Sequence, residues 1–265
     1  MAERQIVGIV LARNEDLHVR RAIENVAAFC DRLILCDHGS TDGTPEIFAD
    51  LTARHPHIES HRLTHPRESH SLLEVYAGSD AWIFGVDGDE IYDPARLSVL
   101  RTQLLAGRYS DSWMILGNVL NCDLVDPVAK TAAGWLAPPC RSITKLYNFS
   151  VIRSWVGVNE ERLHGGFIDF APGHHASDRL YLHEQTSWED APLRCLHTCF
   201  VPRSSLDHGQ LTVRENIMDQ HHAGLLGTAR RWWKNFRGVP VESAWKKSRY
   251  MRGERVTIDA SAFFP

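Results

Sequence analysis

Hydrophobic and polar positions alternate along the first 110 residues in a regular order of strands and helices. Residues 5–12 (QIVGIVLA) form an almost continuous apolar run, which predicts a strand covered on both faces. Residues 16–30 then place apolar side chains at helical spacing. The alternation continues with strands predicted at 32–36, 57–63 and 81–86, and helices from Thr44-Pro45, over 68–78 and over 94–105. We therefore predict an α/β fold: an open, mixed, mainly parallel sheet flanked by helices.

This rhythm changes after residue 110. Strand-like runs occur at 112–120, 142–147, 151–156 and 193–201, whereas 126–139 is a Pro- and Gly-containing stretch and the last fifty residues have a helical pattern. We predict one domain over 1–212, divided into a regular half (1–110) and an irregular half (111–212), followed by a helical, basic extension over 213–265.

Composition narrows the class of protein. The chain has 265 residues, 43% hydrophobic and 23% charged, which is ordinary globular usage. No apolar run approaches the roughly 18–20 residues of a membrane-spanning helix. The six cysteines form no C-x-x-C pair, and a chain of this size needs no disulfides, so a cytoplasmic location is expected.

The charge is unevenly distributed. The net charge is −4, yet residues 213–265 carry ten Lys/Arg and five Asp/Glu. These cations are too dispersed to indicate nucleic-acid binding. The mixed basic and aromatic run 229–237 predicts either peripheral contact with the inner face of a membrane or an ordinary terminal helix with a basic outer face.

Three polar clusters stand where predicted strands end: Arg13–Asp16, Asp37–Asp42 and Asp87–Glu90. Ligands of open α/β sheets bind beyond the carboxyl ends of the strands. In Asp87-Gly88-Asp89-Glu90, two carboxylates on alternate residues can converge on Mg²⁺ or Mn²⁺, which prefer oxygen ligands. The alternative for this motif is a solvated acidic turn that caps the following helix.

The order and spacing of these clusters resemble glycosyltransferase family 2, whose catalytic domain has the GT-A fold. The matching pieces are Arg13-Asn14-Glu15, the segment Asp37-His38-Gly39-Ser40-Thr41-Asp42-Gly43-Thr44, and Asp87-Gly88-Asp89-Glu90. The resemblance covers roughly residues 5–105 and implies inverting transfer of a sugar from a nucleotide-diphosphate sugar. The half 1–110 is then the nucleotide-binding half and 111–212 the acceptor half.

The resemblance also implies roles for individual residues. Nucleotide-sugar contacts fall to Arg13, Glu15, Asp37, His38 and Asp87. Asp89 is implied to bind the divalent metal (Mg²⁺ or Mn²⁺) directly. Asp87 is implied to face the ribose or the metal shell, and His197 is implied as a further metal ligand. His38 stands where the family usually has Asp, so the donor base is not assumed to be uridine.

Inverting transfer needs a general base that takes the proton of the acceptor. The candidates are Asp190, Glu160 and Glu161, and Asp190 is preferred because Glu189-Asp190 resembles an acidic pair of the family that opens an acceptor-side helix. The acceptor expected is a small molecule, a glycan or a lipid-linked glycan.

Two other functions fit parts of the sequence. A strand followed by D-x-D also opens the site of haloacid-dehalogenase-like phosphohydrolases, with Asp87 as nucleophile and Asp89 as acid and base. A nucleotide-sugar-binding relative without turnover is suggested by His38 and by Asn159, which replaces a histidine of the family.

Overall fold

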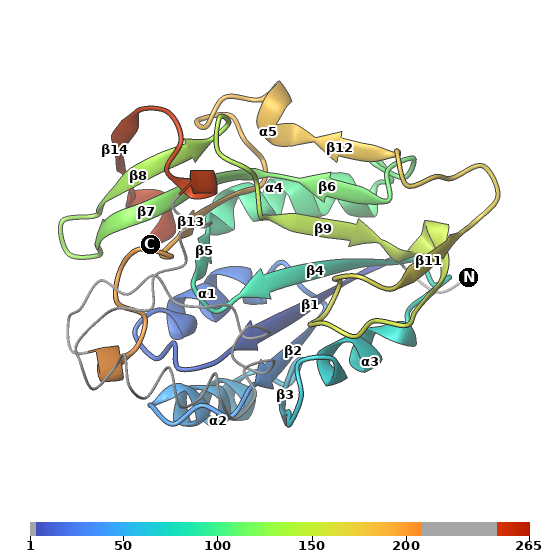
Figure 1. Cartoon of the computed structure of the whole chain (residues 1–265), viewed down its shortest axis with the longest axis horizontal. Coiled ribbons are helices and arrows are strands. Elements are labelled where there is room, and N and C mark those ends of the chain that lie inside the picture. Colours follow the sequence, from blue (N-terminus) through green and yellow to red (C-terminus); the bar gives the residue numbers. More distant parts are fainter. Residues whose placement is uncertain (1–3, 208–247) are drawn as a thin grey trace.

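The computed structural model describes residues 4–207 and 248–265, which build two sheets and their flanking helices (Figure 1). In the first sheet β4, β1, β2 and β3 run parallel, and β9 is antiparallel to both of its neighbours. This is the mixed, mainly parallel α/β arrangement predicted from the sequence. Its strands, in spatial order, are β12 (Arg179–Tyr181), β6 (Met114–Leu116), β9 (Lys145–Asn148), β4 (Ala81–Asp87), β1 (Gln5–Ala12), β2 (Arg32–Asp37) and β3 (Ile58–Arg62).

Both faces of this sheet are covered. Along β4, Trp82 and Phe84 join the core beneath α1 (Val19–Ala27), α2 (Thr44–Arg54) and α4 (Pro94–Leu105), whereas Ile83 faces the opposite core. That second core is closed by α3 (Glu68–Glu74), the turn η1 (Phe149–Val151) and the hairpin of β10 (Ile152–Val156) and β11 (Phe167–Phe170). The near-continuous apolar runs of the parallel strands follow from this double burial.

A second sheet lies beside the first, and the chain passes directly from one into the other at the D-x-D motif. Strand β4 of the first sheet ends at Asp87, and β5 of the second begins at Glu90. The motif is therefore fixed at both of its ends. The strands of the second sheet, in spatial order, are β14 (Arg255–Asp259), β8 (Thr131–Ala137), β7 (Asn118–Asp126), β13 (Arg194–His197) and β5 (Glu90–Tyr92).

The predicted elements of residues 5–105 are confirmed, with ends that differ by a few residues. The Pro- and Gly-containing stretch 126–139, for which no strand was predicted, contains β8. Gly134 of this strand lies so close to Asn121 of β7 that a Cβ would be 2.0 Å from the Asn121 carbonyl oxygen. The remaining short elements are α5 (Leu182–Gln185), η2 (Ser205–Asp207) and η3 (Ser261–Phe263).

The end of the chain differs from its helical prediction where it is described. Residues 255–259 form β14, an edge strand antiparallel to β8, and their alternating exposure has the period of a strand. The predicted boundary at 212 and the basic-aromatic run 229–237 lie outside the described residues. No helix of the described residues has the length and apolar character needed to cross a membrane.

Candidate active site

The loops that follow β1 and β2 are joined by hydrogen bonds. The backbone N–H of Asn14 donates to Oγ of Ser40 (2.9 Å), and that of Glu15 donates to Oγ1 of Thr44 (2.9 Å). In return, the Thr41 N–H donates to Oδ1 of Asn14 (2.7 Å). Asn14 has a φ of 54°, in the left-handed region that asparagine tolerates better than most residues. The R-N-E and D-H-G-S-T-D-G-T segments therefore form one connected rim.

Asp37 and His38 lie inside this rim and are buried. Oδ1 of Asp37 accepts the Ser40 N–H (2.9 Å), which closes the turn after β2, and the His38 N–H donates to the Ala12 carbonyl (2.9 Å). Arg13 is half-buried directly after β1. These residues, predicted to contact the nucleotide, share one strand-end region with Glu15.

The D-x-D motif packs against the same rim. The Gly88 N–H donates to the Leu11 carbonyl (3.2 Å), and a Cβ at Gly88 would lie 2.1 Å from Oε2 of Glu15. Glycine suits the position between the two aspartates, because an added Cβ would displace the end of the Glu15 side chain and lie 3.0 Å from Cβ of Ala12. The structure thus brings together all three clusters that the sequence placed at strand ends.

Asp89 is buried in a network of charged groups. Its Oδ2 forms an ion pair with Nη1 of Arg203, which also contacts Oε1 of Glu15 at 3.2 Å. Nε2 of His197 lies 3.5 Å from the same Asp89 oxygen, and its Nδ1 is 2.9 Å from Oδ1 of Asn121. Burial opposes the charge of Arg203, but Asp89 and Glu15 outweigh it and raise the pKa of the guanidinium.

The segment that carries Arg203 is fastened to the rim. The Leu17 N–H donates to the Arg203 carbonyl (3.1 Å), Oγ of Ser204 donates to Asp42 (2.7 Å), and Ser205 donates through N and Oγ to Asp16 (2.7 and 2.6 Å). Residues 203–205 therefore lie across the loops after β1 and β2. Sequence reasoning missed Arg203, whose partner Asp89 is 114 positions away.

Asp87 is held by a second arginine that the sequence did not reveal. Nη2 of Arg162 donates to Oδ1 of Asp87 (2.6 Å) and to the Val86 carbonyl (2.6 Å). Gly85 makes room for this approach, since a Cβ there would be 3.0 Å from Leu163 and 3.8 Å from Arg162. Half of the Asp87 side chain stays accessible, at 47% exposure.

Glu161, one of the three candidate bases, lies next to Asp87 in the loop between β10 and β11. Burial and the negative charge of Asp87 raise the pKa of Glu161 to about 7, against the opposing charges of Arg162 and Lys145. Glu160 is exposed and lies near Gly165. Of the two, Glu161 has the surroundings of a general base that titrates near neutral pH.

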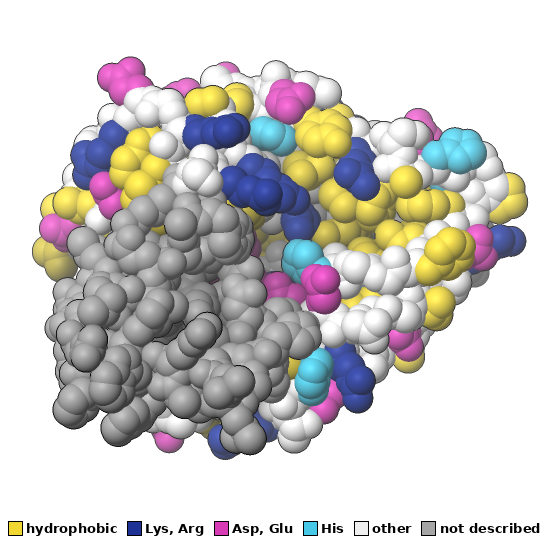
Figure 2. All heavy atoms as spheres, in the orientation of Figure 1, with side chains coloured by type: hydrophobic (Ala, Val, Ile, Leu, Met, Phe, Trp, Pro, Cys, Tyr) yellow, Lys and Arg dark blue, Asp and Glu magenta, His cyan; other side chains and the backbone are white. Residues whose placement is uncertain are grey.

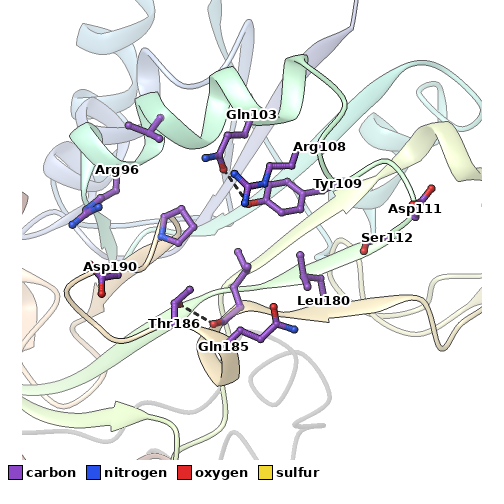
Figure 3. A pocket seen from close by; sticks show the side chains of 13 residues that line it. Arg96, Gln103, Arg108, Tyr109, Asp111, Ser112, Leu180, Gln185, Thr186 and Asp190 are labelled. Atoms are coloured by element: carbon purple, nitrogen blue, oxygen red, sulfur yellow. Dashed lines mark hydrogen bonds between the residues drawn. The ribbon is translucent and has the colours of Figure 1, made fainter.

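Asp190 lies in a different region. It lines a cavity of about 530 Å³ between α4, β12 and α5, together with Arg96, Gln103 and Tyr109 (Figure 3). Its carboxylate accepts the Ser187 hydroxyl (3.0 Å). The segment is tied to the far end of β5, because Arg194 binds both the Trp188 carbonyl and Asp93, four residues beyond Asp89.

The remaining carboxylate of the motif, Glu90, is structural. It is fully enclosed and accepts hydrogen bonds from the Tyr92 hydroxyl (2.9 Å) and the Asp87 N–H (3.1 Å). Tyr250, from the described end of the chain, places its ring 5.6 Å from the ring of His197. Its carbonyl accepts from the Cys140 thiol (2.9 Å), so the end of the chain reaches the site.

Comparison with known proteins gives one family. The model of the family described as "Glycosyl transferase family 2" matches residues 9–149, which is more than half of the chain. No curated protein matches.

Several solved structures resemble the chain in part. A mannosyltransferase from Pyrobaculum calidifontis, in complex with GDP-mannose and Mn²⁺, is 20% identical over 47% of this chain and 36% of its own, with a TM-score of 0.32. Glucosyl-3-phosphoglycerate synthase from Mycobacterium tuberculosis, in complex with phosphoglyceric acid, is 18% identical over 56% of this chain and 58% of its own, with a TM-score of 0.37. The chain thus spans less than two thirds of either structure.

Proposed function

The chain belongs to glycosyltransferase family 2, and from that premise we propose that it transfers a sugar, with inversion, from a nucleotide-diphosphate sugar to an acceptor hydroxyl. The observation that carries the proposal is the meeting of three strand ends around Glu15, Arg203 and Asp89. Such a site offers hydrogen-bonding groups for a nucleoside and a charged region for a diphosphate. The nucleoside falls to Arg13, Glu15, Asp37 and His38, with Asp87 facing the ribose.

The residues around Asp89 fit a divalent cation. The Asp89 carboxylate already accommodates one cationic group, the guanidinium of Arg203, and Nε2 of His197 lies 3.5 Å from the same oxygen. Burial opposes the charge of His197, but Cys199 and Asp89 outweigh it and raise the pKa of His197 to about 10, so a metal ion would have to displace a proton from this imidazole in order to bind it. No set of three or more His, Cys, Asp or Glu side chains gathers as a metal site in residues 4–207 and 248–265. Mg²⁺ and Mn²⁺ are commonly held by only one or two protein carboxylates together with substrate phosphates, so Asp89 and His197, with Asp87 near by, are an adequate set. When bound, the ion neutralises charge on the departing diphosphate.

Glu161 is the proposed general base, in preference to Asp190 and Glu160. Its carboxylate takes the acceptor proton as the acceptor oxygen bonds to the anomeric carbon, and the bond between that carbon and the diphosphate oxygen breaks with its electron pair leaving on the diphosphate. We propose that the Arg203 side chain turns from Asp89 toward the diphosphate as this charge develops. A guanidinium is suited to this role because it binds phosphate in a bidentate manner. Arg162 holds the Asp87 carboxylate in place.

Membership of glycosyltransferase family 2 argues against the phosphohydrolase alternative. It does not distinguish an active transferase from a relative that binds nucleotide sugars without turnover, and the experiment below does so. We propose the cytoplasm as the location; for the basic-aromatic run 229–237, peripheral membrane contact and an ordinary terminal helix with a basic outer face stay as alternatives.

Substitution of Asp89 tests the proposal. Thermal shift with a panel of nucleoside diphosphates and Mn²⁺ is expected to identify the base, and Asp89→Ala is expected to abolish the metal-dependent shift while circular dichroism stays unchanged, because Glu15 still pairs with Arg203. Asp123→Ala is the matched control, since Asp123 pairs only with Arg255 at the edge of the second sheet among the contacts described. An undiminished shift in Asp89→Ala contradicts the proposed site.

Two activity measurements distinguish the alternative functions. Donor binding without release of nucleoside diphosphate in any acceptor mixture indicates the binding protein without turnover. Hydrolysis of p-nitrophenyl phosphate without nucleotide sugar indicates the phosphohydrolase.

A further inference from the structure

Lys145 lies beside the proposed base Glu161, and a second cation, Arg141, lies near Lys145. Lys145 begins β9 and Arg141 precedes it by four residues, and neither forms an ion pair with a carboxylate in the part of the chain that the structure describes. We propose that the acceptor is an anion, a hydroxyl compound carrying a phosphate or carboxylate group, and that Lys145 and Arg141 bind that group. This inference rests on the proposed function, because it assigns the acceptor of the same reaction.

The position of Lys145 directs it at the acceptor side. Lys145 pairs with Gly85 across β9 and β4, so both lie on the face of the sheet that Arg162 and Leu163 cover. Its Nζ is 3.1 Å from Nε2 of His164. Burial and the charge of Lys145 lower the pKa of His164 to about 4, so this imidazole is neutral at pH 7, and its Nε2 accepts a hydrogen bond from the lysine ammonium group. His164 therefore orients the ammonium group without neutralising it.

The acidic groups near by do not compensate this charge. The carboxylate of Asp87 is already paired with Arg162 at 2.6 Å. Oε1 of Glu161 lies 3.7 Å from Nδ1 of His164, and no ion pair joins Glu161 to Lys145 within the described residues. Burial and the neighbouring Arg141 lower the pKa of Lys145 in spite of the opposing charges of Asp87, Glu161 and Glu90. A bound anion adds negative charge where Lys145 and Arg141 repel each other.

The location also separates this anion from the diphosphate of the donor. Arg203 lies on the Asp89 side of the motif, between Asp89 and Glu15, whereas Lys145 lies on the Asp87 side with Glu161. Lys and Arg side chains gather near the middle of the face seen in Figure 2, beside His and acidic side chains. An acceptor held there by its anionic group presents its hydroxyl to Glu161.

Calorimetry with small anions tests this assignment in the absence of donor. Glycerol 3-phosphate and glycerate are the charged probes, and glycerol is the neutral one, all in phosphate-free buffer of low ionic strength. We expect binding of at least one charged probe and none of glycerol, about tenfold weaker binding in Lys145→Gln and in Arg141→Gln, and retention in Lys145→Arg. Arg153→Gln is the control, since Arg153 is exposed and pairs with Asp169 on the β10–β11 hairpin.

A second measurement distinguishes an anionic group of the acceptor from the diphosphate of the donor as the ligand of Lys145 and Arg141. Nucleoside diphosphate affinity is expected to be unchanged in Lys145→Gln, which also shows that the variant is folded. If Lys145→Gln weakens nucleoside diphosphates instead, the two cations serve the donor and the inference is overturned. Failure of both charged probes to bind, or equal binding by wild type and Lys145→Gln, overturns it as well.

The same data distinguish the inference from the function on which it rests. Binding of an anion that depends on Lys145, in a protein that turns over no nucleotide sugar, leaves the anion site standing and refutes the transferase. Transfer to a neutral acceptor at a rate that Lys145→Gln does not change refutes the anionic acceptor and leaves the transferase standing.

Discussion

At the scale of single residues, the site separates its carboxylates by what surrounds them. Asp89 and Asp87 each form an ion pair with an arginine, whereas Glu161 is half-buried beside Asp87. Like charge and burial both favour the protonated form of a carboxyl group. The site therefore holds two carboxylates paired with arginines and one carboxyl group, Glu161, whose pKa of about 7 lets it exchange a proton near neutral pH.

This difference predicts the pH dependence of the reaction. Glu161 accepts a proton only as a carboxylate, so the transfer rate is expected to rise with pH through about 7 and to level off above it. The groups that set this pKa are Asp87 on β4, Lys145 on β9, and Arg162 and Glu160 on its own loop. Glu161→Gln is expected to slow transfer about 10²- to 10⁴-fold and to remove the rise, with donor affinity unchanged.

Asp190→Asn is the matched control for this substitution. Asp190 lies in the cavity beside α4, and its replacement is expected to leave both the rate and the pH profile within a few-fold of wild type. The reverse result, a large loss in Asp190→Asn and a small one in Glu161→Gln, makes Asp190 the base. The profile is measured as initial rates of nucleoside diphosphate release from pH 5 to 9.

At the scale of elements, the sequence was informative where neighbours in the chain are neighbours in space. The alternation of 5–105 specifies parallel strands joined by helices, and the strand ends then place R-N-E, D-H-G-S-T-D-G-T and D-G-D-E together. Arg162 and Arg203 could not be predicted in this way. Both lie in irregular segments, and their partners Asp87 and Asp89 are 75 and 114 positions earlier in the sequence. Only the requirement that buried carboxylates be paired points to such residues.

The segment 203–205 contributes to the site as a strand or helix would, because it places the guanidinium of Arg203 against Asp89. Arg203 and a divalent ion compete for the same carboxylate oxygen. Arg203→Gln removes the guanidinium that Glu15 and Asp89 share, so we expect Mn²⁺ affinity in the absence of donor to rise about tenfold and the Tm without metal to fall. Electron paramagnetic resonance of free Mn²⁺ measures the affinity.

Arg62→Gln serves as the comparison for Arg203→Gln. Arg62 is 70% exposed and its Nε is 3.9 Å from Asp37, so its loss is expected to change neither quantity. Equal Mn²⁺ affinity in Arg203→Gln and wild type means that Asp89 is not the carboxylate that holds the ion.

At the scale of the whole molecule, the described end of the chain joins the second sheet to the helices of the first. Strand β14 extends the second sheet, and η3 then packs against α4. Asn25 of α1 donates to the carbonyls of both Tyr92 and Phe263 (2.8 Å each). The sequence pattern of the last fifty residues predicted helix, whereas β14 forms by pairing with β8, more than a hundred residues earlier in the chain.

Substitution of Phe263 tests whether the contacts of the C-terminal segment with α1, α4 and the second sheet make the two sheets unfold together. Its ring is 1% exposed and stacks on Trp188, with centroids 5.9 Å apart, and Arg194 lies over the same ring. Phe263→Ala is expected to lower the free energy of unfolding by about 3–5 kcal/mol, since a buried aromatic ring is replaced by a cavity. Phe167→Ala removes the same ring from a site that is 68% exposed, and its effect is expected to stay within about 0.5 kcal/mol. Urea unfolding followed by tryptophan fluorescence measures both, and a single transition that shifts in Phe263→Ala shows that the two sheets unfold together. Two separate transitions in wild type, with only one of them displaced by Phe263→Ala, mean that the second sheet is an independent unit that merely adjoins the nucleotide-binding half.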